Sequence, residues 1–191
     1  MDNSNNQNYE RNNTFLESKT FRNLHTTLDG ELKASAKYRI YAEKAKEEGF
    51  QQIGNIFGES SHNEQEHAEV MMKILFGEVP DTLQNLKDAS GGENHEWSSL
   101  YKSFADEARA EGYPGIAKIF EGIAAIEKHH DFRFDSLAEN IETGKVFCST
   151  EKTLWICMNC GNLYSGVCAP EKCPVCGYPQ GYYKLNCEDY N

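Results

Sequence analysis

Two Glu-x-x-His motifs, Glu64-x-x-His67 and Glu127-x-x-His130, hold the side chains of this sequence that are best suited to bind a metal. Residues three positions apart on a helix project about 60° from one another, so both side chains of such a motif can reach one metal site. A chain this rich in glutamate contains about one such motif by chance. The two motifs lie 63 positions apart, which places both of them in a larger pattern.

That pattern is an internal repeat. The same offset of 63 joins Tyr38 to Tyr101, Gly49 to Gly112, Ile53 to Ile116 and Phe57 to Phe120. A third match, Glu59-x-x-His62, has no counterpart at this offset, and we regard it as a chance match. Glu31 and Glu93 are 62 positions apart, so the second half has one extra residue between its glutamate and its tyrosine. A single extra residue inside a helix is often absorbed as a π-bulge, and we expect one here.

Several of these glutamates stand where a helix core is expected. Steps of three and four along the first helix give the seam Phe21, Leu24, Leu28, Glu31, Ser35, Tyr38, Ala42 and Ala45. The second helix gives Ile53, Phe57, Ser60, Glu64, His67, Met71 and Ile74, and the fourth gives Ile116, Phe120, Ile123, Glu127, His130, Phe134, Leu137 and Ile141. A lone buried carboxylate is costly unless a cation neutralises it. The interruptions at mid-helix therefore indicate a cation among the helices.

The set of candidate ligands matches a paired-metal site. Helical bundles that hold two iron or two manganese ions use one glutamate from each of two helices and Glu-x-x-His from each of the other two. Glu31 and Glu93 are the single glutamates here, and Glu96 is a further carboxylate one turn after Glu93. Tyr38 and Tyr101 share this inner face. Either they are core aromatic residues, or they orient a ligand or supply a proton.

A second metal site is predicted near the carboxyl end. Two Cys-x-x-Cys-Gly turns supply the four thiols Cys157, Cys160, Cys173 and Cys176. Four thiolates arranged as a tetrahedron bind zinc or iron. A module this short has little core of its own, so its metal supplies much of its folding free energy. We interpret Cys148, Cys168 and Cys187 as structural or free thiols.

The elements that position these residues follow from the repeat. Each half predicts two helices joined at Gly49 or at Gly112, and two such hairpins make a four-helix bundle. The stretch 77–92, which holds Pro80 and two adjacent glycines, is expected to be a long connection between the halves. We expect a disordered Asn-rich tail over 1–13, a helical bundle over 14–145, a linker over 144–152 and a metal-bound domain of strands and loops over 152–191.

Bulk properties exclude several classes of partner. Thirty acidic residues against 19 basic ones give a formal net charge of −11, which argues against nucleic acid and against an anionic membrane surface. No apolar run approaches the ~18 residues of a transmembrane helix. The polar first residues resemble no secretory signal. Cysteines in metal-binding pairs, with an odd number left over, indicate a reducing compartment, and we expect the cytoplasm.

The order of these motifs along the chain resembles that of rubrerythrin. The motifs are Gly30-Glu31, the segment 63–68, Gly92-Glu93 with Glu96, the segment 127–130 and the four-cysteine module. The resemblance covers roughly 20–190. It implies a mainly α protein, a ferritin-like di-iron four-helix bundle followed by a small rubredoxin-like domain. It also implies three iron ions per chain, with zinc as a substitute, and a head-to-tail homodimer.

The resemblance also implies a role for each ligand. Glu64 and Glu127 would bridge the two irons, and Glu93 and His130 would be terminal ligands of one of them. Glu31 would bind the other iron, together with Glu96 in the oxidised state and His67 in the reduced state. The implied activity is a peroxidase that reduces hydrogen peroxide to water in oxidative stress defence. A rubredoxin or a flavoprotein reductase fed by NAD(P)H would be the electron-donor protein.

Two other functions fit parts of the sequence. A ferroxidase that uses oxygen would form a cage and grow mineral, and a zinc-ribbon interaction protein would be colourless. Neither use requires a one-electron iron–thiolate relay beside a paired-metal site. The combination of the two sites in one chain therefore favours turnover with an outside electron donor.

Overall fold

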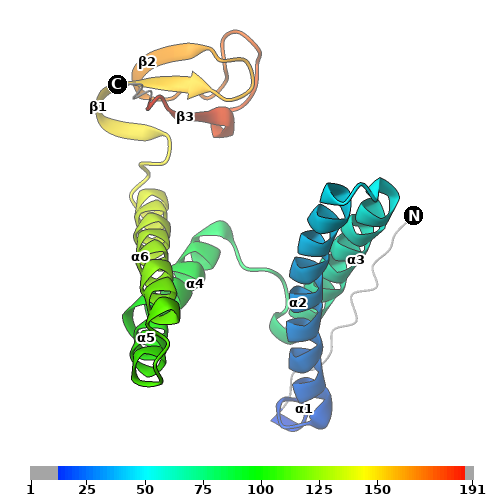
Figure 1. The fold of residues 1–191 in the computed structure, drawn as a ribbon. Coiled ribbons are helices and arrows are strands. Elements are labelled where there is room, and N and C mark those ends of the chain that lie inside the picture. Colours follow the sequence, from blue (N-terminus) through cyan, green and yellow to red (C-terminus); the bar gives the residue numbers. More distant parts are fainter. Residues whose placement is uncertain (1–12, 188–191) are drawn as a thin grey trace. The chain divides into compact units, whose positions relative to one another are not determined.

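The computed structural model describes residues 13–187 and is mainly helical, with a small strand domain at its carboxyl end (Figure 1), which confirms the expected fold class. The helices are α1 (Asn13–Leu16), α2 (Lys19–Glu47), α3 (Gln51–Phe76), α4 (Thr82–His95), the π-helical turn η1 (Glu96–Leu100), α5 (Tyr101–Ala110) and α6 (Pro114–Glu142). The strands are β1 (Cys148–Cys157), β2 (Leu163–Cys168) and β3 (Tyr183–Leu185), with a 3-10 turn, η2 (Gln180–Tyr182), before β3. Of the predicted tail, residues 1–12 lie outside the described residues, and Asn13 begins α1.

The chain divides into two compact units, one up to Val79 and one from Pro80 onward. The first unit is the α2–α3 hairpin (blue to cyan in Figure 1), and its turn is closed at Gly49, where φ is 89°. The amide of Phe50 donates to the carbonyl of Ala45 at 2.8 Å across this turn. Positive φ is a conformation that glycine adopts at little cost, which explains the residue type at this position.

The second unit repeats this turn between α5 and α6. Gly112 has φ of 88°, and the amide of Tyr113 donates to the carbonyl of Ala108 at 2.7 Å. The two turns thus share residue type, dihedral angle and hydrogen bond at the offset that the sequence shows. The predicted pair of helical hairpins is confirmed at this level of detail.

Small residues let α2 and α3 approach closely. The buried positions of α2 are Leu28, Ser35, Ala42 and Ala45, all of them on the predicted seam, and those of α3 are Gly54, Ser61, Ala68 and Leu75. A Cβ added at Gly54 would lie 2.9 Å from the carbonyl oxygen of Ala42, so the backbones are nearly in contact there. The hairpin therefore depends on glycine at this position.

The buried line of α3 differs from its predicted seam by one position. Ile53 and His67, expected to lie in the core, are exposed, and their neighbours Gly54 and Ala68 are buried. The prediction assumed one apolar face per helix, whereas α3 buries only the line that faces α2. Ile116 and Leu137 of α6, also expected in the core, are likewise exposed within the second unit.

The predicted connection over 77–92 is wrong, because α4 already begins at Thr82. Asp81 caps this helix by accepting a hydrogen bond from the amide of Gln84 at 2.9 Å. The helical conformation continues through Gly91 and Gly92, and nothing lies within 4 Å of a Cβ added at either glycine. Only residues 77–81 connect α3 to α4.

The extra residue of the second half is absorbed as expected. Helices α4 and α5 are joined by the π-helical turn η1, which lies between Glu93 and Tyr101. The amide of Tyr101 donates to the carbonyl of Glu96 across this turn, the i+5 pattern of a π-helix. The predicted π-bulge is confirmed.

The strand domain is a three-stranded antiparallel sheet in the order β2-β1-β3. Trp155 and Tyr183 are its largest buried residues and pack with Cys157, Cys173 and Ala169. The strands begin at Cys148, so the predicted linker over 144–152 is structured in its second half. Among the described residues, no helix is long and apolar enough to cross a membrane.

Two of the remaining cysteines form a disulfide in this domain. Cys148 and Cys168 lie directly opposite each other on β1 and β2 and are bonded. Cys187 is free and exposed. The sequence left open whether these cysteines are structural or free. In the structure, Cys148 and Cys168 form a disulfide that links β1 to β2 at one end of the sheet.

Candidate metal centres

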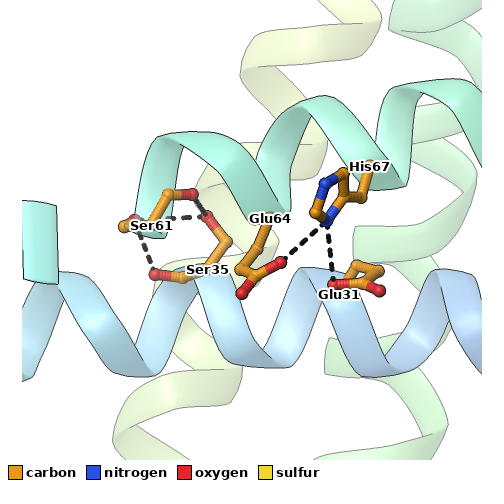
Figure 2. A network of polar contacts seen from close by, with 5 residues as sticks. All are labelled: Glu31, Ser35, Ser61, Glu64 and His67. Atoms are coloured by element: carbon orange, nitrogen blue, oxygen red, sulfur yellow. Dashed lines mark hydrogen bonds and ion pairs between the residues drawn. The ribbon is translucent and has the colours of Figure 1, made fainter. Parts of the chain in front are cut away.

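The α2–α3 hairpin brings together three of the predicted ligands. Glu31, Glu64 and His67 place ligand atoms within 4.8 Å of one another. Nδ1 of His67 lies 2.8 Å from Oε2 of Glu64 and 3.7 Å from Oε2 of Glu31 (Figure 2). The side chains of both glutamates are about one quarter exposed or less, whereas that of His67 is 59% exposed. We call these three residues the first half-site.

Two serines hold the helices in register beside this half-site. Oγ of Ser35 donates to the carbonyl of Ser61, and Oγ of Ser61 donates to the carbonyl of Ser35, each at 2.8 Å. Both serines are buried, and Figure 2 shows them about one turn along α2 and α3 from the glutamates. Because each hydroxyl bonds the opposite backbone, the pair fixes the level of Glu31 on α2 against that of Glu64 on α3.

The second unit repeats the arrangement with Glu93, Glu127 and His130, whose ligand atoms also lie within 4.8 Å of one another. Nδ1 of His130 is 2.6 Å from Oε2 of Glu127 and 3.7 Å from Oε1 of Glu93. These distances nearly equal those of the first half-site. We call these three residues the second half-site.

The carboxylates of the second half-site disfavour one another's ionised form, and this arrangement favours binding of a cation. Burial raises the pKa of Glu93 above its usual value, and the charge of Glu127 and a hydrogen bond with it raise this pKa further. Burial, followed by the charges of Glu96 and Glu127, also raises the pKa of Tyr101. Carboxylates that disfavour one another's ionised form are stabilised when a cation lies between them.

Glu96 and the two tyrosines lie near these ligands. Glu96 opens the π-helical turn and affects the pKa values of Glu93 and Tyr101, so it belongs to the same electrostatic cluster. The ring of Tyr101 stacks on Phe120, with centroids 6.1 Å apart, and the ring of Tyr38 lies 6.1 Å from that of Phe57. Whether Glu96 and the tyrosines act on a metal stays a prediction.

Asp131 is a positioning residue that the sequence did not reveal. Its carboxylate accepts hydrogen bonds from Ser90 and Asn94 of α4 at 2.7 and 2.8 Å, and from the indole of Trp97 in η1 at 2.9 Å. These bonds lower the pKa of Asp131. Because Asp131 follows His130 directly, it ties the helix of one ligand pair to the helix of Glu93. No motif marks it, since its partners lie 34 to 41 positions away.

The four paired cysteines meet at one point of the strand domain. Sγ of Cys157 is 3.8 Å from that of Cys176, and Sγ of Cys160 is 3.6 Å from that of Cys173. A tetrahedron with metal–sulfur bonds of about 2.3 Å has sulfur–sulfur edges of about 3.8 Å. The four atoms therefore already have the spacing of a tetrathiolate metal site.

Hydrogen bonds around Cys173 favour its thiolate, whereas burial and hydrogen bonds with the neighbouring cysteines raise the pKa of Cys160. Burial alone raises the pKa of Cys173, but hydrogen bonds from Tyr183 and from the amides of Cys176 and Val175 outweigh it and lower the pKa to about 6. Gly161 and Gly177, which follow the two motifs, have positive φ and turn each loop back, as each amide donates to the first cysteine of its motif. A thiolate is the form that binds iron or zinc.

The donor sets suit iron at all these positions. Each half-site offers carboxylate oxygens and an imidazole nitrogen, which are ligands of non-haem iron, and the four thiolates suit iron as well as zinc. Glu59 and His62, the chance match, belong to no cluster of ligands among the described residues. The grouping of the six half-site residues is thus an observation, and their individual roles stay predictions.

Comparison with known proteins agrees with these features. A model of the rubrerythrin family matches residues 22–84 and 84–155, and a model of the rubrerythrin rubredoxin-like domain matches 155–184. The chain is 44% identical to rubrerythrin of Clostridium perfringens, over 91% of this chain and 97% of that protein. It is 40% identical to rubrerythrin-1 of Clostridium acetobutylicum, with the same coverage.

Solved structures with related sequences include nigerythrin in a mixed-valence state. It is 26% identical to this chain, covers 88% of it and 86% of its own length, and superposes with a TM-score of 0.33. The chain has two carboxylate–histidine half-sites and a four-cysteine site, and its relatives match it over nearly the whole length. It therefore belongs to the rubrerythrin family, a group of iron-binding oxidoreductases.

Proposed function

We propose that this protein reduces hydrogen peroxide to water at a di-iron site and is re-reduced through an iron bound by its four cysteines. The balanced step is the reduction of one hydrogen peroxide by two electrons and two protons to two waters, with cleavage of the O–O bond. The single observation that carries the proposal is the pair of nearly identical half-sites in the same chain as a tetrathiolate site.

When bound, a pair of ferrous ions supplies two electrons together, and the thiolate-bound iron replaces them one at a time from an outside donor. Three iron ions per chain are required. Glu64 and Glu127 are the proposed bridging ligands, as the resemblance to rubrerythrin implies, and each lies within 2.8 Å of the histidine of its motif.

His67 and Glu96 are the proposed pair of alternative ligands. His67 is the most exposed of the half-site side chains, so it has room to turn toward or away from a metal. Glu96 opens the π-helical turn, and single π-helical turns inside helices are frequent at functional sites. Tyr101, which interacts electrostatically with Glu93, Glu96 and Glu127, is the proposed proton source for the water that forms.

The proposed electron donor is a rubredoxin or a flavoprotein reductase that uses NAD(P)H. Cys160 is the exposed member of the four ligands, and it provides the route by which an outside donor reaches this iron. The other three ligands are buried or half-buried.

A single-turnover experiment tests the proposal. The protein is loaded with iron, fully reduced without oxygen, and mixed with one equivalent of hydrogen peroxide in a stopped-flow cell. Consumption of the peroxide, with return of the ferric–thiolate absorbance, is the expected result. If peroxide is consumed no faster than by free ferrous iron, the proposed peroxidase activity is wrong. If no thiolate colour ever forms, the four-cysteine site does not act as an electron relay.

A further inference from the structure

The disulfide between Cys148 and Cys168 lies apart from the regular pairing of β1 with β2. In the regular part, residues 153–156 pair one by one with residues 163–166. Between this ladder and the disulfide, the four residues 149–152 of β1 lie opposite a single residue of β2. Such a bulge interrupts the ladder of hydrogen bonds. The disulfide therefore joins a short, separate contact between the two strands.

Other contacts hold the strand domain together. Its buried core is built around Trp155 and Tyr183, and neither half of the disulfide belongs to it. Beside the disulfide, the amide of Ala169 donates to the carbonyl of Phe147 at 2.8 Å, and the ring of Phe147 packs against the core. A metal in the four-cysteine site adds folding free energy of its own. The disulfide can therefore open while the domain stays folded.

The other cysteines of the chain are thiols. All seven cysteines lie within the described residues, and five of them are free, namely the four paired cysteines and Cys187. The four paired cysteines bind a metal only in the reduced form. Where surroundings keep thiols reduced, the disulfides that do form are usually transient and catalytic or redox-sensing. This setting favours a pair that cycles between two states over a permanent cross-link.

The two sulfur atoms can meet and part without a change of fold. Cys148 and Cys168 are direct partners in the register of the two strands, so the same backbone holds both thiols and the disulfide. Cys168 is exposed, whereas Cys148 is half-buried. A small oxidant or a reducing thiol therefore reaches Sγ of Cys168 first, and Cys148 is the neighbour that closes the bond.

We propose that Cys148 and Cys168 form a second site that reduces hydrogen peroxide, one that needs no metal. Sγ of Cys168 attacks one oxygen of the peroxide, so that an S–O bond forms, the O–O bond breaks and the other oxygen leaves as water. The thiol of Cys148 then attacks the oxidised sulfur, which forms the S–S bond and releases the second water.

The cycle balances with a dithiol as the reductant. Two protein thiols and one hydrogen peroxide give one disulfide and two waters. A dithiol then attacks the exposed sulfur, takes over the disulfide and returns both protein thiols. This second site shares its substrate with the proposed di-iron site, but no iron takes part in its reaction.

Peroxide consumption driven by a dithiol tests the second site. The iron-loaded protein in its ferric form is mixed with dithiothreitol and hydrogen peroxide, and both reagents are followed together with the ferric–thiolate absorbance. The wild-type protein should consume one dithiol for each peroxide while the absorbance stays constant. The Cys148→Ser/Cys168→Ser variant should lose this consumption and fall to the rate of the reagents alone. Cys187→Ser, which removes a free exposed thiol of the same domain, is the matched control and should keep the wild-type rate.

Peptide masses identify the bond that forms. Cleavage after lysine places Cys148 in the peptide 146–152 and Cys168 in the peptide 153–172. After acid quenching and alkylation of free thiols, the two peptides should be separate in protein treated with dithiol. They should be linked after one further equivalent of peroxide. In a Cys148→Ser variant, excess peroxide should instead carry Cys168 to the sulfinic or sulfonic acid, because no neighbouring thiol closes the disulfide.

These outcomes separate the two proposals. Peptides that stay linked under dithiol while the iron is retained, or equal dithiol-driven consumption by the wild-type protein and the double serine variant, would overturn the second site. Consumption that depends on the cysteine pair, in a protein whose reduced iron does not react with peroxide, would support the second site and contradict the proposed di-iron activity.

Discussion

Trp97 donates a hydrogen bond from its indole nitrogen to Asp131 at 2.9 Å, and thereby joins the π-helical turn to α6. Asp131 accepts two further bonds from α4. One carboxylate thus fixes the backbone that carries Glu93 against the helix that carries Glu127 and His130.

Loss of this carboxylate should loosen the second unit. We expect Asp131→Ala to lower the free energy of unfolding by about 2 kcal/mol, because three donors lose a charged acceptor at a half-buried position. Asp131→Asn should cost less, since one amide oxygen remains as an acceptor. Asp135→Ala, one turn further along α6 at an exposed position, is the matched control. Helical circular dichroism during thermal unfolding measures all three, and equal midpoints for Asp131→Ala and Asp135→Ala would contradict the assignment.

Two glycines of α3 should respond in opposite directions to the same substitution. Gly54→Ala should destabilise the first hairpin, because its Cβ would lie 2.9 Å from the carbonyl oxygen of Ala42 and 2.6 Å from Cγ of Lys46. Gly58→Ala should stabilise the helix by up to about 1 kcal/mol, because nothing lies within 4 Å of its Cβ and alanine is the better helix former. Urea unfolding of both variants measures the difference. Stabilisation by Gly54→Ala would show that the two helices pack less closely than described.

The disulfide and the four-cysteine site should be separable. A Cys148→Ser/Cys168→Ser variant should keep the full ferric–thiolate absorbance, because neither sulfur belongs to the tetrathiolate cluster. Its strand domain should lose about 2 to 3 kcal/mol of stability, because a link across 20 positions no longer restrains the unfolded chain. Cys187→Ser, at the free exposed cysteine, should change neither property. Lost iron in the double variant would contradict the assignment of ligands.

Two substitutions should divide the proposed catalytic cycle into its parts. Cys160→Ser should abolish turnover driven by an electron donor but leave one round of peroxide reduction by the prereduced protein. Glu127→Ala should abolish both, because it removes a proposed bridging ligand. Single-turnover and steady-state rates measured on the same preparations distinguish these outcomes. A Glu127→Ala protein that still completes one fast turnover would refute the bridging role.

The repeat made much of the first unit predictable. The seam of α2 is correct at every position from Phe21 to Ala45, since all of its members are buried or half-buried. The π-helical turn followed from one difference in spacing, 62 against 63. The seam of α2 follows from helix periodicity, and the π-helical turn follows from the repeat spacing. Both can be read from the sequence without knowledge of contacts between helices.

Other features depend on contacts that periodicity does not contain. The early start of α4 was missed because Ser90, Gly91 and Gly92 resemble a helix break, although Pro80 and Asp81 form a good helix start. Asp131 gave no signal, because its three partners become neighbours only after α4 and α6 pack together. The disulfide was missed because the paired cysteines indicated a reducing compartment, in which the remaining thiols stay apart.

The matched turns at Gly49 and Gly112 have a consequence for the origin of this protein. Each hairpin carries one single glutamate among the proposed ligands and one Glu-x-x-His motif, so two identical hairpins would supply every proposed ligand of the di-iron site except Glu96. A symmetric pair of chains that each hold one such hairpin would be complete in the same sense. The simplest history is therefore duplication and fusion of a hairpin-coding gene. The extra residue in the π-helical turn, beside Glu96, marks the point at which the two copies ceased to be equivalent.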